Sequence, residues 1–177
     1  MNDSKLPPQA LEAEQSVIGG LMLDNRKWEE VEDEISEMDF YSHNHRLIFR
    51  AIAGLQNSDQ AADVITVSET LENQGKLEDA GGLVYLGTLA NNTPSTANIL
   101  TYARIVRERS ILRSLIAAGT DIIDSSYNPD GRSTREVLDH AEKRVLDISN
   151  FEGSSRKGFL TIQELTVQSL NRIEELT

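Results

Sequence analysis

A long helical segment without interruption most constrains what this chain can fold into. Residues 98–125 contain no proline and one glycine, and their apolar side chains lie on more than one side of a helix. Residues 128–131, Asn-Pro-Asp-Gly, follow and are typical of a tight turn, and residues 133–136 then have the form of a capping box. The next apolar positions recur at helical spacing and suggest a seam: Leu138, Ala141, Val145 and Ile148. Two helices joined by a tight turn form an αα-hairpin, which we expect over residues 98–151.

Shorter helical patterns precede the hairpin. Apolar residues recur every three or four positions over residues 11–22, where Gly19–Gly20 indicates close approach of another backbone. A further helix is predicted from His43 to Gln56, and Thr66 to Glu69 have the form of a capping box that opens another helix. We therefore predict an all-α protein in which residues 1–97 form a compact multi-helix head and the hairpin projects from it.

The C-terminal part of the sequence predicts a linker and one more helix. Residues 152–160 are mostly small, polar or basic and are expected to form a flexible linker. Residues 161–177 begin with a third capping box at Thr161 and are expected to form a linker helix. This helix has an apolar stripe, which consists of Ile162, Leu165, Ile173 and Leu176. A short isolated helix is marginal in water, so we expect this stripe to dock on a partner or on another domain.

The sequence nominates no catalytic, cofactor-binding or metal-binding residue. There is no cysteine, and the only Gly-Lys pair, Gly75–Lys76, lacks the other residues of a phosphate-binding loop. His43 is expected to help cap a helix, His45 to pack or to face water, and His140 to lie on the polar side of the hairpin seam. The acidic run over residues 29–34 is interpreted as a solvated face.

The charge distribution argues against tight nucleic-acid binding. The net charge is −12, and residues 1–97 carry 6 basic and 17 acidic residues. An acidic head repels phosphates, so little direct contact with nucleic acid is expected. A basic patch on the long helix has two open interpretations, salt bridges within the protein or contact with DNA or an acidic partner; it comprises Arg104, Arg107, Arg109 and Arg113. Neither a signal peptide nor a membrane span is recognisable, so a cytoplasmic location without membrane contact is expected.

Several motifs together resemble a known family. Residues 6–23 read LPPQALEAEQSVIGGLML and closely resemble the N-terminal signature of DnaB-family replicative helicases. Further matches follow in the same order: Phe40–Tyr41, His45-x-x-Ile48–Phe49, residues 71–75, Gly81–Gly82-x-x-Tyr85–Leu86, residues 92–95 and Tyr102–Ala103-x-Ile105–Val106-x-Glu108–Arg109. The resemblance covers essentially the whole chain, and the combination of motifs is specific although no single motif is.

The resemblance implies a role in DNA replication. Members of the family form hexameric rings that unwind duplex DNA with ATP, bound with magnesium in a RecA-like motor domain. That motor is absent from this sequence, so the chain looks like a fragment that is not an enzyme by itself. Hairpins of neighbouring subunits pair into a collar built as a trimer of dimers, and a DnaG-type primase docks there. A helicase loader is a further candidate partner, and the last helix packs on a neighbouring subunit's motor.

We therefore expect a collar module that mediates homo-oligomerisation and primase docking at replication forks. The hairpin positions expected to make these contacts are Ile116, Ile122, Val137 and Leu138. Two alternatives stay open: a stand-alone helical scaffold or interaction module, whose last helix would be packed and protected, and a small all-helical enzyme with a concave pocket.

Overall fold

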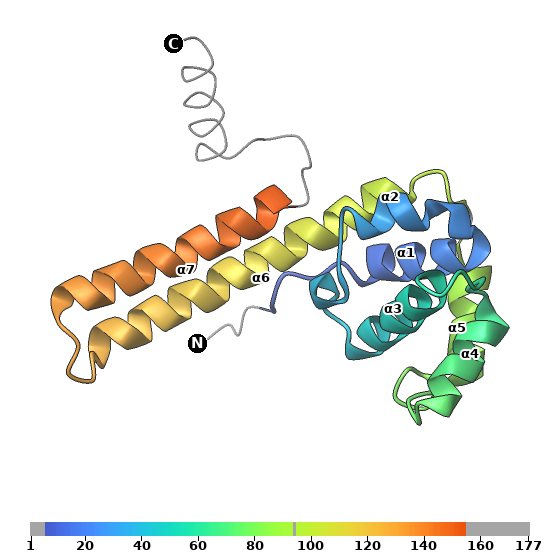
Figure 1. Cartoon of the computed structure of the whole chain (residues 1–177), viewed down its shortest axis with the longest axis horizontal. Helices are drawn as coiled ribbons and strands as arrows, with labels where there is room; N and C mark the ends of the chain where they lie inside the picture. Colours follow the sequence, from blue (N-terminus) through green and yellow to red (C-terminus); the bar gives the residue numbers. More distant parts are fainter. Residues whose placement is uncertain (1–5, 94, 155–177) are drawn as a thin grey trace, which may run out of the picture.

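The computed structural model describes residues 6–93 and 95–154, with side chains up to residue 150. Every regular element in these residues is helical, which confirms the predicted all-α fold (Figure 1). The α-helices are α1 (Leu11–Leu23), α2 (Trp28–Glu32), α3 (His43–Gln56), α4 (Val64–Asn73), α5 (Gly82–Asn91), α6 (Ile99–Tyr127) and α7 (Thr134–Ser154). Two short 3₁₀ turns, η1 (Asn25–Lys27) and η2 (Glu37–Asp39), flank α2.

Helices α1 to α5 and the first part of α6 form the head around one apolar core. Helix α1 lies at its centre and contacts α3, α5 and α6. The rings of Trp28 and Phe40 pack on Phe49, with centroids 5.4 and 4.9 Å away. Burying one such side chain contributes about 1.5–3 kcal/mol, and the core holds many of them, including Ile18, Leu21, Ile48, Ile52, Leu71 and Leu86. The head is thus the part of the described chain with a substantial core of its own.

The two glycines in α1 allow the helix to approach its neighbours closely. A Cβ atom built on Gly19 would lie 2.1 Å from Thr93 Oγ1 and 2.3 Å from the carbonyl oxygen of Leu89. A Cβ on Gly20 would lie 2.8 Å from Ile99 Cδ1 at the start of α6. The expected close backbone approach at Gly19–Gly20 is therefore confirmed, and it brings α1 against α5.

The start of α4 differs from the prediction. The helix begins at Val64, and its N-cap is Asp63, whose Oδ1 accepts the amide protons of Ile65 and Thr66 at 2.9 Å each. Thr66 completes the box because its Oγ1 accepts the Asp63 amide proton at 2.8 Å. The predicted capping box ran from Thr66 to Glu69, and that prediction was wrong. The observed box has the same spacing but begins three residues earlier, at Asp63, and ends at Thr66.

We expect the Asp63 cap to make stability depend on pH. Its pKa is lowered, chiefly by the backbone hydrogen bond from Thr66, so the cap's contribution is present above the unfolded-state pKa near 3.8. It is lost as the pH falls through the lower folded-state value. Asp63→Ala is expected to lower the free energy of unfolding at pH 7 by about 1 kcal/mol, and by less at pH 2.5. Urea unfolding at both pH values measures this.

The control for the cap is Asp63→Asn, which keeps a side-chain acceptor but cannot titrate in this range. It should remain close to the wild-type protein at pH 7. If Asp63→Ala destabilises the protein equally at both pH values, the charge-assisted cap is not the cause.

Helices α6 and α7 form the predicted hairpin, which projects from the head as an antiparallel pair (Figure 1). Their turn places Asp130 and Gly131 at positive φ, 49° and 82°. Ser133 opens α7 with the predicted capping box, because Glu136 Oε2 accepts the Ser133 amide proton at 2.7 Å and Ser133 Oγ accepts that of Glu136 at 3.3 Å. Helix α7 continues to Ser154, beyond residue 151 where the hairpin was expected to end.

The predicted linker helix, with Thr161 and the stripe of Ile162, Leu165, Ile173 and Leu176, lies outside the described residues. Within the described part of the chain, no helix combines the length and apolar character needed to cross a membrane.

Candidate docking surface on the helical hairpin

The seam between α6 and α7 contains two of the four predicted side chains, Ala141 and Ile148, but not the other two. On α7, Val137, Ala141 and Ile148 are half-buried, whereas Leu138 and Val145 are 58% and 48% exposed. The prediction of a seam through Leu138 and Val145 was therefore wrong. Each residue of a helix is rotated by about 100° from the one before it. The face of α7 that meets α6 is therefore centred about 90° around the helix from Leu138.

A polar cluster joins the two helices at the edge of this seam, where its side chains stay partly exposed. His140 Nε2 is 2.8 Å from Asp121 Oδ2, and Arg144 Nε is 3.0 Å from the same oxygen. The hydrogen bond from His140, together with Arg144, holds the pKa of Asp121 below its usual value. His140 is 34% exposed and pairs with a charged group, as expected for a residue on the polar side of the seam.

The hairpin beyond the head buries little apolar surface by itself. Among the described residues after Ser110, only Ala118 and Ser125 are fully buried. Beside the polar cluster the seam opens into a cavity of about 310 Å³, lined by Ile111, Ser114, Ala117, Arg144, Asp147 and Ile148. Two helices with so small a core are marginally stable in water unless another surface covers them.

Helix α6 carries an exposed apolar stripe on the side facing away from α7. It consists of Leu112, Ile116, Ile123 and Tyr127, which are 40%, 56%, 56% and 82% exposed, and we call it the α6 stripe. Leu112 and Ile116 are four positions apart, as are Ile123 and Tyr127, so each pair shares this helix face, and Gly119 lies between the two pairs. Leu115, at 45% exposed, lies on the flank of the stripe. Exposed apolar side chains gathered on one face of a projecting element are typical of a protein–protein contact.

The four hairpin residues predicted to make partner contacts divide into two pairs. Ile116 belongs to the α6 stripe, and Leu138 is exposed on α7. Ile122 and Val137 are half-buried between the two helices. The structure thus leaves Ile116 and Leu138 accessible and does not bring all four residues together on one surface.

Most of the basic patch on α6 anchors the hairpin to the head. Arg107 Nη1 lies 3.1 Å from both carboxylate oxygens of the fully buried Asp39. Arg113 donates hydrogen bonds to the carbonyl oxygens of Asp39 and Pro8, and burial lowers its pKa. Arg104 pairs with Glu34 at 3.0 Å. For these three arginines the structure supports the first interpretation, salt bridges and hydrogen bonds within the protein.

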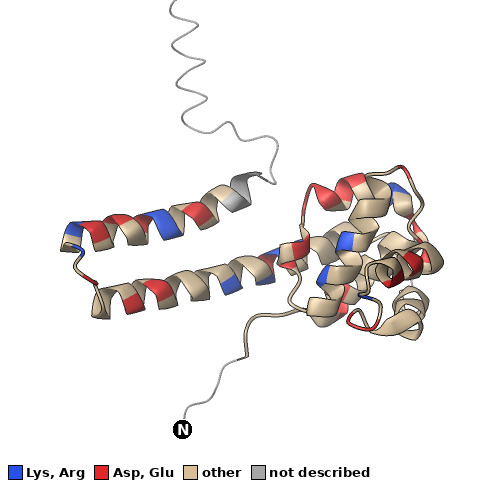
Figure 2. Ribbon diagram, turned by 60° about the horizontal axis from the view of Figure 1, so that its bottom comes forward, with Lys and Arg blue, Asp and Glu red and all other residues tan. Residues whose placement is uncertain are grey.

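Arg109 differs from the other arginines of the patch. It is exposed and forms no ion pair with any residue that the structure describes. Acidic residues are spread over the surface of the head, from which α6 extends (Figure 2).

A buried polar network in the head was missed by the sequence analysis. Glu14 Oε2 accepts a hydrogen bond from His45 Nδ1 at 2.7 Å, and His45 Nε2 is 2.7 Å from Tyr85 Oη. Glu14 also accepts the amide protons of Tyr41 and Ser42 at 2.7 and 3.2 Å. The network joins α1, α3 and α5, and it satisfies the amide groups of the two residues that directly precede α3. The sequence held a signal for the burial of Glu14. It precedes two core residues, Val17 and Ile18, by three and four positions, and so shares the apolar face of α1.

The two histidines of α3 have unequal roles. His45 is buried and packed, as one of the two expectations stated. His43 is the exposed first residue of α3, and Ser42 occupies the N-cap position, so the prediction that His43 caps the helix was wrong.

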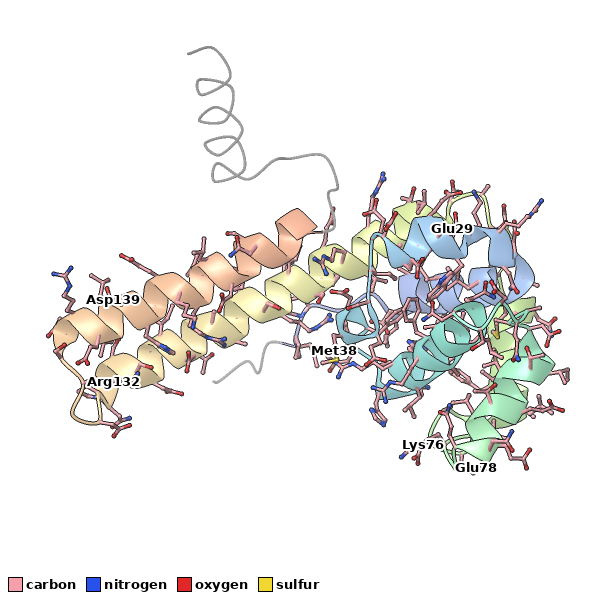
Figure 3. All side chains as sticks on the ribbon, in the orientation of Figure 1. Glu29, Met38, Lys76, Glu78, Arg132 and Asp139 are labelled. Carbon is pink, nitrogen blue, oxygen red and sulfur yellow. The ribbon has the colours of Figure 1, made fainter. Side chains whose placement is uncertain are left out.

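The Gly75–Lys76 pair and most of the acidic run over residues 29–34 lie on the surface of the head. Gly75–Lys76 lies just after α4 at the outer end of the head, and Lys76 Nζ is 3.8 Å from Asp79 (Figure 3). The amides of Gly75 and Lys76 already donate to the carbonyl oxygens of Glu72 and Leu71, as at an ordinary helix C-terminus. No group of three metal-ligating side chains occurs in the described parts of the chain. Most acidic residues of the run are exposed, as expected for a solvated face, and Glu29 is labelled in Figure 3. Glu34 differs because it is half-buried and pairs with Arg104.

Comparisons with known proteins agree on one family. The family model "DnaB-like helicase N terminal domain" matches residues 6–108. The replicative DNA helicase DnaB of Buchnera aphidicola subsp. Baizongia pistaciae is 48% identical over 169 residues, which are 96% of this chain and 36% of that protein. The replicative DNA helicase DnaC of Bacillus subtilis is 36% identical over 99% of this chain and 38% of its own length. The chain therefore spans somewhat over a third of the length of these curated relatives.

Solved structures point to the same family. The N-terminal domain of DnaB helicase from Mycobacterium tuberculosis has a TM-score of 0.78 and 38% identity, with 80% of this chain and 99% of that chain covered. A DnaB-like replicative helicase, whose structure is described together with its interactions with primase, shares the fold with a TM-score of 0.66 and 22% identity, over 93% of this chain and 35% of that chain. The head, the projecting hairpin and these matches together show that the chain belongs to the DnaB-like helicase N-terminal domain family.

Proposed function

We propose that this chain is the collar module of a replicative DNA helicase, which assembles with further copies through its hairpin and offers the assembly to a primase. The observation that carries the proposal is the α6 stripe, an exposed apolar surface on an arm with almost no core of its own. A stand-alone scaffold has no need of such an arm. The names of the relatives support the replicative setting, and the interactions with primase described for one neighbour support the partner.

In this proposal the chain binds other copies and a primase, and ATP hydrolysis takes place in a separate motor domain. ATP and magnesium would bind to a motor domain of the RecA type that is not among these residues. The acidic head is unsuited to phosphate backbones, so DNA would be held mainly by that motor. The final helix, through Ile162, Leu165, Ile173 and Leu176, would pack on a neighbouring motor, and a helicase loader would act on the same assembly.

We expect one carboxylate introduced into the α6 stripe to weaken self-association. Ile116→Asp should weaken self-association by about 30-fold or more, because a carboxylate would be buried in the centre of the interface. Sedimentation equilibrium across a concentration series measures the dissociation constant, and circular dichroism checks that the helical content is unchanged.

Ile65→Asp is the matched control, since Ile65 is an isoleucine of nearly equal exposure, 58% against 56%, on α4 in the head. It should associate like the wild-type protein. A wild-type protein that stays monomeric at all concentrations would instead favour the stand-alone scaffold, and equal association of both variants would move the interface away from the α6 stripe.

A further inference from the structure

We propose that Asp130, at the tip of the hairpin, is a site of spontaneous isoaspartate formation, in which the amide nitrogen of Gly131 attacks the Asp130 side chain. This covalent modification is independent of the proposed function. Three features of the described residues support it: the conformation of the turn, the absence of partners for the two reacting groups, and the glycine that follows the aspartate.

A tight turn at the hairpin tip holds both residues in the left-handed region. The amide of Arg132 donates to the carbonyl oxygen of Pro129 at 2.9 Å, so Asp130 and Gly131 are the two central residues of a four-residue turn. Their φ angles of 49° and 82° are typical of a type I′ turn, a conformation that glycine adopts freely and aspartate only with strain. The turn ends at Arg132, which is labelled at the tip of the arm in Figure 3. The bond between Asp130 and Gly131 is thus presented far from the head.

The two reacting groups are exposed and have no partners. Within the part of the chain that the structure describes, the Asp130 carboxylate forms no hydrogen bond or ion pair, and the Gly131 amide donates to no acceptor. A carboxylate that is held by donors, such as that of Asp63 or Asp121, would have to leave them before it could react. Asp130 has no such contact to break.

Gly131 leaves the path of attack open. Its nitrogen must approach Cγ of Asp130, which requires rotation about the backbone bonds, and glycine has no Cβ atom to obstruct that rotation. Apart from its chain neighbours, no described atom lies within 4 Å of the position that a Cβ atom on Gly131 would occupy. The surroundings of the turn therefore do not hinder ring closure either.

Ring closure and ring opening need no reactant other than water. The Gly131 nitrogen forms a bond to Cγ of Asp130, a Cγ–O bond breaks, and water leaves with the amide proton. Water then opens the cyclic succinimide at one of its carbonyl carbons. Attack at Cγ restores aspartate, whereas attack at the main-chain carbonyl carbon of Asp130 gives isoaspartate, in which the chain runs through Cβ and Cγ. One water is lost and one is gained, and no group is oxidised or reduced.

Isoaspartate would lengthen the main chain of the turn by one methylene group. The hydrogen bond from the Arg132 amide to the Pro129 carbonyl oxygen encloses this segment, so its present geometry could not be kept. Ser133, which follows directly, opens α7 with its capping box. The modification would therefore change the connection at which α7 begins and leave the head untouched.

Asp59 is a matched control within the same chain. It is also exposed, and its φ angle is positive, 55°. The residue that follows it is Gln60, which has a side chain and whose amide already donates to the carbonyl oxygen of Leu55 at 2.9 Å. Asp59 should therefore form isoaspartate at least about tenfold more slowly than Asp130.

Ageing of the full chain, followed by digestion and mass spectrometry, measures the two rates. The protein is kept in a mildly acidic buffer, because a carboxylic acid loses water more readily than a carboxylate, and trypsin then releases residues 51–76 and 114–132. Endoproteinase Asp-N cleaves before aspartate and not before isoaspartate. Cleavage before residue 130 should decline with time, whereas cleavage before residue 59 should persist. Treatment of the aged protein with an isoaspartyl methyltransferase and S-adenosylmethionine should restore the lost cleavage.

Gly131→Ala provides the second readout, with circular dichroism to check that the helices are retained. Its methyl group should slow the conversion of Asp130 about tenfold. Persistent cleavage before residue 130 in the folded protein, while the same position converts in urea, would mean that the turn protects Asp130 and would overturn the inference. Equal rates at Asp59 and Asp130, an unchanged rate in Gly131→Ala, or no recovery with the methyltransferase would also overturn it. None of these readouts depends on self-association, so they test this modification apart from the proposed function.

Discussion

Asp39→Ala is expected to lower the free energy of unfolding by about 3–5 kcal/mol, the cost of leaving one charge of a buried pair without its partner. Asp39 is completely buried, and the Arg107 side chain that faces it is only 10% exposed. The carboxylate also accepts hydrogen bonds from the backbone amide and hydroxyl of Ser36. Because Arg107 belongs to α6, the change should loosen the base of the hairpin as well as the head.

Urea unfolding followed by circular dichroism measures this loss. Glu34→Ala is the control, since it removes a second pair between the head and α6, to the 62% exposed Arg104, and solvent screens that pair. It should cost no more than about 1 kcal/mol. If Asp39→Ala is as mild as Glu34→Ala, the buried pair does not anchor the hairpin.

Gly19→Ala is expected to destabilise the protein by about 3 kcal/mol, although alanine is the better helix former. The new methyl group would overlap Thr93 Oγ1 and, more seriously, the Leu89 carbonyl group, which is backbone at the end of α5 and cannot rotate away. Relief requires α1 and α5 to separate, and that movement would strain the network between Glu14 and Tyr85.

Gly54→Ala is the matched control, because Gly54 is an exposed glycine inside α3, and a Cβ atom added there meets no other atom within 4 Å. It should stabilise the protein by about 0.5–1 kcal/mol. Thermal unfolding of the two variants should therefore shift in opposite directions. A shift of the same sign and size in both would mean that α1 and α5 are not held in the close contact described.

Local sequence patterns predicted the helices well. The apolar periodicity gave α3 its bounds of His43 and Gln56, and the Ser133 capping box with the preceding turn placed the start of α7. These features depend on residues within a few positions of each other, where backbone hydrogen bonding and capping leave a direct record in the sequence.

Contacts between distant residues were less predictable. Glu14 is 31 positions from His45, and Asp39 is 68 positions from Arg107, so no local pattern pairs them. Leu138 and Val145 were wrongly assigned to the seam because α7 has apolar residues on two sides, and only the rotation of the helix against α6 decides which side is covered. The same ambiguity placed Ile122 and Val137 among the exposed contacts, whereas both are half-buried.

A calorimetric titration shows whether the hairpins of several copies form a docking surface for primase, as we propose. The protein is titrated with the C-terminal helical region of a DnaG-type primase from the same source, while light scattering follows the mass. We expect saturable binding with one primase for two or more chains. The Ile116→Asp variant should bind primase far more weakly than the Ile65→Asp control. Absence of binding to a chain shown to be oligomeric would contradict the claim.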